Sequence, residues 1–387
     1  MLSVGAMLKV LDTDAVVEQK SVKPSSLAAP NTSLRNEVQR AVDKGAAWIT
    51  QNQNTNGFWS TADHPALTGL ALMALQGPNA KRHQTTTPEA VTKGYSFLMR
   101  NMQPDGGIYS KDLPSYNTSI SLLALTFNPT PESKEAMVKA RKFLIGLQAH
   151  FDSPGSTNNA YDGGISYGNG IDKRPDLSNT SWALEALHYS NLALADKNAG
   201  ETGDLNWAAA IAFIQRCQNL PGQNKEAWAS DDSQNKGGFI YSPGRSMAGE
   251  TNLPSGRVAL RSYGTMSYAG LLSYIYADMK KDDPRVRAVM DWLQTNYTLD
   301  ENPGMGPAGL YYYFHTLTKA LNLAEVNAIE TKDGRKVNWR EDLTLKLLNL
   351  QKPDGSWTND TARWFEKDAI LTTSYALITL EMLAGGL

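Results

Sequence analysis

The sequence predicts an all-α protein, a closed (α/α)6 barrel (toroid) of six helical hairpins. Three observations predict this fold. One unit of sequence recurs about six times, each unit holds two helical segments of different character, and the recurrence runs through most of the 387 residues. Such a period is typical of folds whose units pack on their neighbours. Because an open stack leaves two unprotected ends and a ring leaves none, we predict that the ring is closed.

Each unit contains a glycine corner followed by an aromatic residue or isoleucine. Successive corner glycines lie about 50 to 75 residues apart, and they are Gly57, Gly107, Gly164, Gly238, Gly304 and Gly355. Glycine adopts positive φ without steric cost, and the Asp that precedes several corners can bond its own backbone, so we interpret the corners as structural turns. A glutamine shortly before most corners is expected to satisfy carbonyl groups at a helix end.

The helix before each corner is predicted to lie in an outer ring. It is amphipathic, with Lys and Arg among its apolar positions, and so presents one face to water. Its apolar pairs include Trp48-Ile49, Phe97-Leu98, Phe143-Leu144, Phe213-Ile214, Trp292-Leu293 and Leu347-Leu348.

The helix after each corner is predicted to lie in an inner ring. It bears a threonine and is apolar nearly all round, which is typical of a buried helix. These segments include residues 67–75, 120–125, 182–187, 267–274, 316–321 and 373–380.

Composition narrows the function classes. The 37 basic and 39 acidic residues are mixed along the chain, and no basic patch indicates nucleic-acid binding. Cys217 is the single cysteine, which excludes an intrachain disulfide and a cysteine-rich zinc site. No apolar stretch approaches the roughly 20 residues that a membrane span needs. We predict no cofactor and no metal.

Residues 1–33 differ from the repeats. A short apolar start broken by Lys9 leads into a polar segment that ends Pro24-Ser25-Ser26-Leu27-Ala28-Ala29-Pro30. It lacks the basic start and uninterrupted apolar core of a secretory signal. We interpret it as a mobile arm or the remnant of a leader, and residues 34–387 as a single toroid domain. The location stays undetermined: we expect a soluble protein of bacterial type, and export to the periplasm is one interpretation.

The corner repeat resembles that of the squalene-hopene cyclase and protein prenyltransferase superfamily. The runs Gln351-Lys352-Pro353-Asp354-Gly355-Ser356-Trp357 and Gln103-Pro104-Asp105-Gly106-Gly107-Ile108-Tyr109 carry the resemblance. It covers the whole ring and implies the toroid fold. The same fold hosts unrelated functions, so the resemblance is much less specific for activity.

The resemblance implies that the protein is a cyclase, an isomerase acting on terpenoids. It further implies an acidic residue that protonates the substrate. Such enzymes protonate their substrate from an Asp-x-Asp-Asp-Thr-Ala motif, and this chain has Asp176-Leu177-Ser178-Asn179-Thr180-Ser181 in a similar setting. Asp176 matches the first aspartate, Ser178 stands where the proton donor would be, and Asn179 replaces the last aspartate. A serine hydroxyl is too weak an acid for an alkene, so the chemistry implied is altered or lost.

Two further groups of proteins that share this fold have characteristic motifs, with which the sequence can be compared. Protein prenyltransferases bind zinc through Asp, Cys and His, but Cys217 closes a predicted outer helix, away from the inner ring. Complement-like thioester domains carry Cys-Gly-Glu-Gln, whereas Cys217 is followed by Gln218-Asn219-Leu220. Neither site is therefore expected.

The candidate site residues lie near the starts of the inner helices, where side chains can face the central space. We predict Asp176 and His315 as catalytic residues; a helix cap and a buried histidine bonded to the backbone are the respective alternatives. For the aromatic candidates the alternative is core packing, and for Arg261 it is an ion pair with a nearby carboxylate. The predicted ligand-binding residues are His64, Tyr116, Asn179, Trp182, Arg261, Tyr263, Tyr312, Trp364 and Asp368.

Three functions follow as hypotheses. The first is a cyclase-like barrel that binds an isoprenoid or another apolar small molecule in a central cavity, with membrane association as a further option. The second is a carbohydrate-acting enzyme, a glycosidase or lyase, which needs two carboxylates about 5–10 Å apart across an open cleft. The third is a non-enzymatic interaction module, for which no partner protein can be named.

Overall fold

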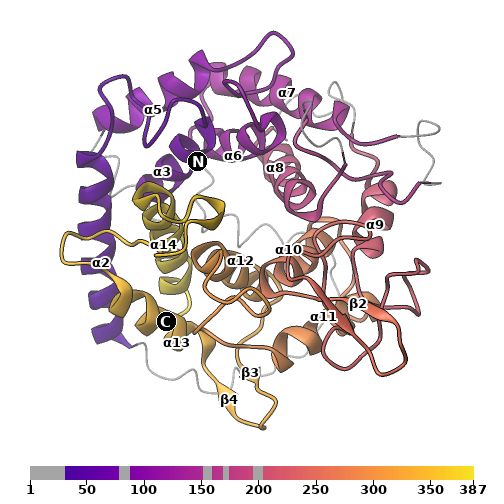
Figure 1. Cartoon of the computed structure of the whole chain (residues 1–387). Helices are drawn as coiled ribbons and strands as arrows, with labels where there is room; N and C mark the ends of the chain where they lie inside the picture. Colours follow the sequence, from indigo (N-terminus) through magenta and orange to yellow (C-terminus); the bar gives the residue numbers. More distant parts are fainter. Residues whose placement is uncertain (1–30, 78–87, 151–158, 169–173, 195–203) are drawn as a thin grey trace, which may run out of the picture.

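The computed structural model describes residues 31–77, 88–150, 159–168, 174–194 and 204–387. These residues form twelve α-helices in two concentric rings (Figure 1), as predicted. The outer ring consists of α2 (Thr32–Gln51), α5 (Pro88–Arg100), α7 (Pro131–Gly146), α9 (Trp207–Arg216), α11 (Pro284–Thr295) and α13 (Trp339–Leu350). The inner ring consists of α3 (Pro65–Gln76), α6 (Pro114–Thr126), α8 (Leu177–Leu194), α10 (Gly264–Tyr276), α12 (Leu310–Leu323) and α14 (Ala369–Ala384).

The ring is closed by its last hairpin. Each inner helix packs on the next one, and α14 packs on α3, while α13 and α14 both contact α2. Among the described residues, the domain predicted from residue 34 starts with α2 at Thr32, and the predicted arm lies outside them except for residues 31–33. Closure therefore joins segments that are more than 300 residues apart in sequence, as Gln351 shows by donating to the Ala41 carbonyl.

The two rings differ in burial as their sequences predict. All residues of α3 are buried, whereas α5 buries only Ala90, Gly94, Tyr95, Phe97 and Leu98. Full burial of a large apolar side chain contributes roughly 1.5–3 kcal/mol. The hydrophobic effect therefore favours placing the wholly apolar segments in the inner ring. Because all the inner helices start at the same end, the side chains of their first turns meet there.

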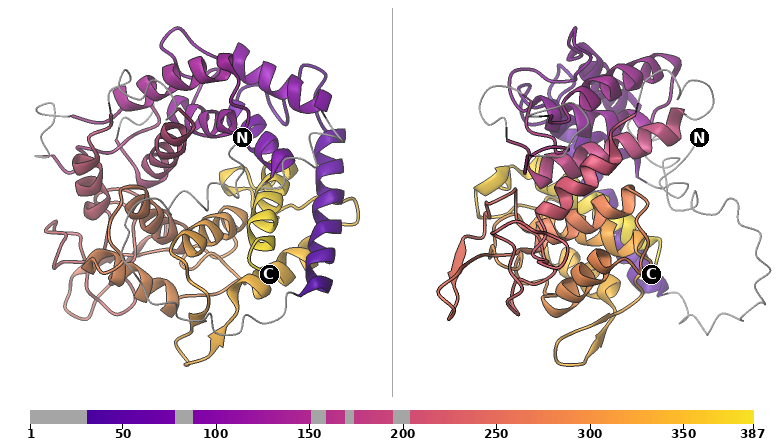
Figure 2. Two further views of the ribbon diagram at one scale, coloured as in Figure 1. Left: turned by 180° about the vertical axis from the view of Figure 1, so that it is seen from behind. Right: turned by 90° about the vertical axis from the view of Figure 1, so that its right-hand side faces the viewer.

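Two short hairpins are inserted into the ring. Strands β1 (Glu250–Asn252) and β2 (Val258–Leu260) pair antiparallel with Thr251 opposite Ala259, and β3 (Ile329–Glu330) pairs with β4 (Lys336–Val337). The edge view in Figure 2 shows the β1–β2 hairpin projecting from one end of the barrel. It lies in the fourth unit, between its corner and the inner helix α10.

At each corner one glycine is held in the left-handed region by a close approach of backbone. In the Gly-Gly corners this is the first glycine, not the second one that the repeat suggests: Gly106, Gly163 and Gly237 have φ of 91°, 88° and 91°. A Cβ on Gly237 would lie 2.1 Å from the Ala288 carbonyl oxygen of the next outer helix. These turns therefore need glycine both for its φ and for its missing side chain.

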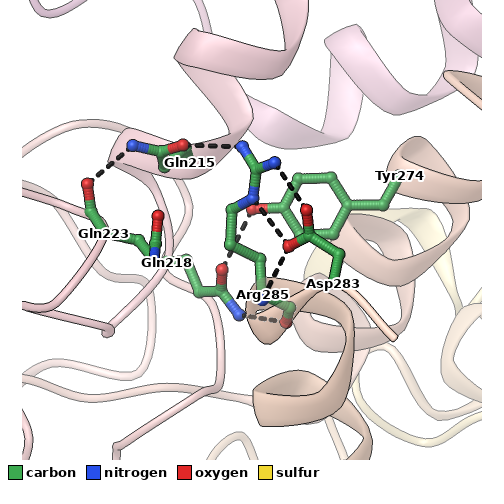
Figure 3. Close-up of polar contacts among 6 residues, drawn as sticks. All are labelled: Gln215, Gln218, Gln223, Tyr274, Asp283 and Arg285. Carbon is green, nitrogen blue, oxygen red and sulfur yellow. Dashed lines mark hydrogen bonds and ion pairs between the residues drawn. The ribbon is translucent and has the colours of Figure 1, made fainter. Parts of the chain in front are cut away.

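At four of the six corners a glutamine ties the corner to the next outer helix. The Nε2 of Gln218 donates to the Gly237 carbonyl at 2.9 Å. It also donates to the Arg285 carbonyl at 2.9 Å, and the Oε1 accepts from the Tyr274 hydroxyl at 3.0 Å (Figure 3). The same pattern recurs at Gln53, Gln148 and Gln351. The second carbonyl lies near the start of the following outer helix or within that helix. It is not one of the last carbonyls of a helix, which we expected to be the acceptors.

The recurrent hydroxyl of the inner helix has a specific partner. The backbone N–H of Ile108 donates to Thr118 Oγ1, and that of Trp357 donates to Thr373 Oγ1, at 2.9 and 3.0 Å. Thr68 and Thr180 play the same part, and in the fourth unit Ser267 does so in place of Thr265. The repeated threonine thus satisfies a buried backbone donor of its own corner.

Candidate functional site

A cavity of about 180 Å³ lies at the end of the barrel where the inner helices begin. Six of the predicted ligand-binding residues line it, and their rings come from five inner-helix starts and from the loop before α14: His64, Tyr116, Trp182, Tyr263, Tyr312 and Trp364. The repeat brings them together, because the inner helices begin at the same end of the barrel.

The lining also contains residues that were not predicted, among them the aromatic and acidic residues Tyr167, Tyr241, Phe365, Glu366 and Tyr375. Tyr167 and Tyr241 stand at the same place in two units, three residues after the second glycine of a Gly-Gly corner. This shared position could have identified both tyrosines from the sequence. It was missed because the corners were interpreted as structural turns only. Glu366 and Phe365 carry no such signal, because they lie in a loop of irregular sequence.

Aromatic rings pack closely around the inner part of the cavity. Trp182 stacks on Tyr312 with ring centroids 5.8 Å apart and planes 11° apart, and Tyr312 stacks on Tyr375 at 5.7 Å. Tyr116 meets Trp182 edge to face at 6.4 Å. These contacts fix the rings in place, so the cavity is preformed.

Two hydroxyl groups of the cavity lining lie near each other: the Tyr167 and Tyr241 hydroxyl oxygens are 3.5 Å apart. Burial raises the pKa of Tyr116 to about 12 and that of Tyr312 further. The tyrosines are therefore neutral, and they offer hydroxyl groups rather than phenolate charge to a ligand.

Asp176 is a helix cap rather than a cavity-lining residue. It lies directly before α8, and its Oδ1 and Oδ2 accept from the backbone N and the Nδ2 of Asn179 at 2.9 and 2.8 Å. Burial raises its pKa to about 6, against the opposing effect of these bonds. Burial and the nearby Asp176 carboxylate raise the pKa of Tyr241, a lining residue.

His315 lies behind the aromatic rings instead of in the cavity lining. Its ring is 6.0 Å from Trp182 and 5.1 Å from Tyr375, and the side chain is buried. Within the described part of the chain neither ring nitrogen has a hydrogen-bond partner. Burial, assisted by the nearby Lys319, lowers its pKa well below the usual value, so the imidazole is neutral.

The other three predicted residues are also outside the lining. Asn179 is buried and accepts from Ser115 of α6, which joins two inner helices. Arg261 is exposed beside the β1–β2 hairpin. Asp368 caps α14 by accepting from the backbone N of Ile370 and Leu371, and it also accepts from Ser60.

Glu366 supplies the carboxylate of the lining. It is 1% exposed. Its Oε1 accepts from the backbone N of Tyr312 at 3.0 Å, and its Oε2 accepts from Asn359 Nδ2 at 2.6 Å. Burial raises its pKa, while the N–H groups at the start of α12 act in the opposite direction. A carboxylate at a helix N-terminus is electrostatically favourable.

Residues 358–368, here named the rim loop, form one side of the cavity mouth. Trp364 and Phe365 are consecutive non-glycine residues with positive φ, 55° and 65°. They are 41% and 55% exposed, although both also line the cavity. Consecutive left-handed residues with large side chains are strained, and such strain is typical of functional sites.

The described residues contain no group of three or more His, Cys, Asp or Glu side chains arranged to hold a metal ion. Cys217 is buried at the end of α9, and burial raises its pKa far above the usual value. None of the described helices is both long and apolar enough to cross a membrane.

Comparison with known proteins identifies the fold. No family model matches the chain, and no curated protein does. Among solved structures, a variant of the type II terpene cyclase MstE from Scytonema, in complex with geranylgeranyl dihydroxybenzoate, is 14% identical with a TM-score of 0.54. That match covers 92% of this chain and 100% of the cyclase.

A second group of similar structures consists of mannanases. An inactive variant of the α-1,6-mannanase GH76A of Salegentibacter sp. HEL1_6, in complex with α-1,6-mannotriose, is 10% identical with a TM-score of 0.55. It covers 91% of this chain and 99% of that one. A GH76 α-mannanase of Bacteroides thetaiotaomicron is also 10% identical, with a TM-score of 0.53 over 92% and 95% of the two chains. The chain thus has the closed α/α toroid fold that these cyclases and mannanases share.

Proposed function

We propose that this protein binds a small, largely apolar ligand of isoprenoid type in the cavity at the inner-helix starts. One observation carries the proposal: nine of the eighteen lining residues are Phe, Trp or Tyr, and they enclose a preformed space. Small-molecule sites are commonly concave and apolar with a few placed polar groups. Here the polar groups are those of His64, Ser178, Thr265 and Glu366 and the tyrosine hydroxyls.

The size of the cavity limits what fits inside it. An apolar cavity of roughly 150 Å³ holds benzene, and drug-sized ligands occupy about 300–1,000 Å³. The volume of about 180 Å³ therefore accepts one isoprene unit or one ring. A longer isoprenoid would place one end in the cavity and extend past Trp364 and Phe365 of the rim loop.

The carbohydrate-acting alternative requires a different arrangement. It predicts two carboxylates facing each other across an open cleft. Among the described lining residues, Glu366 alone carries a carboxylate, and Asp176 is turned into hydrogen bonds with Asn179. For this reason the apolar ligand is the function that we favour.

The test is a binding series with isoprenoid alcohols of one to four isoprene units, followed by organic extraction of the washed protein and mass spectrometry. Squalene is included, because a cyclised product would add catalysis to binding. We expect retention of at least the shorter alcohols. Retention of none of them, with the protein folded, would overturn the proposal.

A cavity-filling variant sharpens the test. Leu371 lines the cavity, so Leu371→Trp should fill it and abolish retention. The matched control is Leu345→Trp, because Leu345 is 44% exposed on α13, away from the cavity. Equal retention by both variants would contradict the proposed site. Asp176→Ala and His315→Ala distinguish an interaction module, whose binding they should leave unchanged.

A further inference from the structure

We propose that the polar end of the ligand is an organic ammonium group, held among the aromatic rings of the cavity next to Glu366. The inference deepens the proposed function and rests on it, since it concerns the same cavity. It names the charge of the ligand, which the aromatic lining by itself leaves open.

The charged side chain that belongs to the cavity lining is negative. Among the described lining residues Glu366 is the one carboxylate, His64 is the one histidine, and there is no lysine or arginine. Two basic side chains stack on lining rings from outside the lining: Lys319, which forms an ion pair with Glu185, and Arg363. Within the lining, a bound anion would therefore meet a carboxylate and the negative faces of aromatic rings, and no lysine or arginine.

Glu366 cannot turn away to water. Its carboxylate is held by Asn359 Nδ2 and by the Tyr312 backbone N, from two different segments, and the side chain is buried. In a site from which water is largely excluded, a fixed carboxylate attracts a cation more strongly than an exposed one does. An ammonium group beside it would also stabilise the ionised form.

Rings of the cavity already accept cations on their faces. The Arg363 guanidinium lies 4.5 Å from the centroid of the Trp364 ring, and Lys319 Nζ lies 4.8 Å from that of Trp182. Both tryptophans line the cavity. Electron-rich faces around a carboxylate are the usual features of sites that bind ammonium groups.

The experiment uses three probes that share one benzene ring and differ in charge: benzylamine, benzyl alcohol and benzoate. Each is titrated into the full-length protein at pH 7 by calorimetry. We expect benzylammonium to bind about 10-fold tighter than benzyl alcohol, which is the effect of roughly one favourable charge contact, and benzoate not to bind. Glu366→Gln should remove most of that ratio.

Two controls keep the outcomes separate. Glu37→Gln removes an exposed carboxylate of α2 and should leave the ratio intact. Trp364→Ala, at a partly exposed position, should weaken benzylammonium more than benzyl alcohol and serves if Glu366→Gln fails to fold.

The outcomes bear on the two proposals differently. If benzyl alcohol binds as tightly as benzylammonium, or benzoate binds best, the ammonium inference is overturned while the proposed function stands. If no probe binds and no isoprenoid is retained, both are overturned. Equal weakening of both probes by Trp364→Ala also contradicts the inference.

Discussion

The glycine corners and the rim loop both place residues in the left-handed region of the backbone, but with opposite choices of residue. The corners use glycine at each such position, for example Gly237 and Gly355. The rim loop uses Trp364 and Phe365 at φ of 55° and 65°. The corners are therefore relaxed turns that hold the ring together, whereas the rim loop maintains strain in order to place two rings at the cavity mouth.

The largest expected effect breaks a corner. Gly237→Ala should lower the free energy of unfolding by about 3–5 kcal/mol, because the new Cβ would lie 2.1 Å from the Ala288 carbonyl oxygen and φ is +91°. Urea unfolding measures it. The control is Gly256→Ala, at φ +81° with no atom within 4 Å, where only the roughly 1–2 kcal/mol of left-handed strain applies. Similar losses at both sites would refute the role of close approach.

The next effect concerns the buried carboxyl between the third corner and α8. The pKa of Asp176 is raised to about 6 in the folded chain, above its ordinary value of 3.8. The folded state then keeps a proton that the unfolded state has lost. Its stabilising contribution is complete below about pH 4 and is lost as the pH rises through 6, a change of about 3 kcal/mol.

Unfolding in urea at several pH values from 4 to 7 measures this loss. Asp176→Asn should flatten the pH dependence, since the amide does not titrate and asparagine caps helices well. Asp231→Asn, at an exposed loop position, should leave it as in the native chain. An unchanged slope in Asp176→Asn would show that another group is responsible.

A smaller effect is expected from removing a corner glutamine. Gln218→Ala should destabilise the protein by about 2 kcal/mol, because the buried Tyr274 hydroxyl loses its acceptor and the Gly237 and Arg285 carbonyls lose a donor. The midpoint of thermal unfolding reports it. Gln234→Ala, at an exposed position, is the matched control, and an equal shift in both would argue against the corner bonds.

The smallest effect relaxes the rim loop. Asparagine tolerates left-handed φ better than phenylalanine does, so Phe365→Asn should raise the free energy of unfolding by about 0.5–1 kcal/mol. It should also weaken ligand retention, because a lining ring is lost. Leu345→Asn, elsewhere on the surface, should change neither property appreciably. A gain in stability without any loss of binding would show that ligand binding does not depend on the strained residue.

Much of the fold follows from local sequence. The recurrence of the corners and the contrast between amphipathic and wholly apolar helices predicted two rings and their closure, and both are observed. The same reasoning chose Gly107 and Gly164 as the corner positions, whereas Gly106 and Gly163 hold the positive φ. A repeat locates a turn within a residue or two, but only backbone packing selects the residue that needs φ above zero.

The candidate site was predictable to the extent that it follows the repeat. His64, Tyr116, Trp182, Tyr263 and Tyr312 stand near inner-helix starts and line the cavity together. Asp176 and His315 also stand near inner-helix starts, but neither lines the cavity. Asp176 caps α8, and His315 lies behind the aromatic rings. A step of one residue along a helix turns a side chain by about 100°, so small differences in register decide which residues reach the axis.

The sequence by itself determined the architecture of this protein, because hydrophobic period and corner chemistry are local properties that six units repeat. Only the tertiary structure decided the character of its cavity. Glu366 and Phe365 come from an irregular loop and meet Tyr167 and Tyr241 of distant units only after the ring has closed. The charge and size of a central cavity are sums over all six units, and no single stretch of sequence contains them.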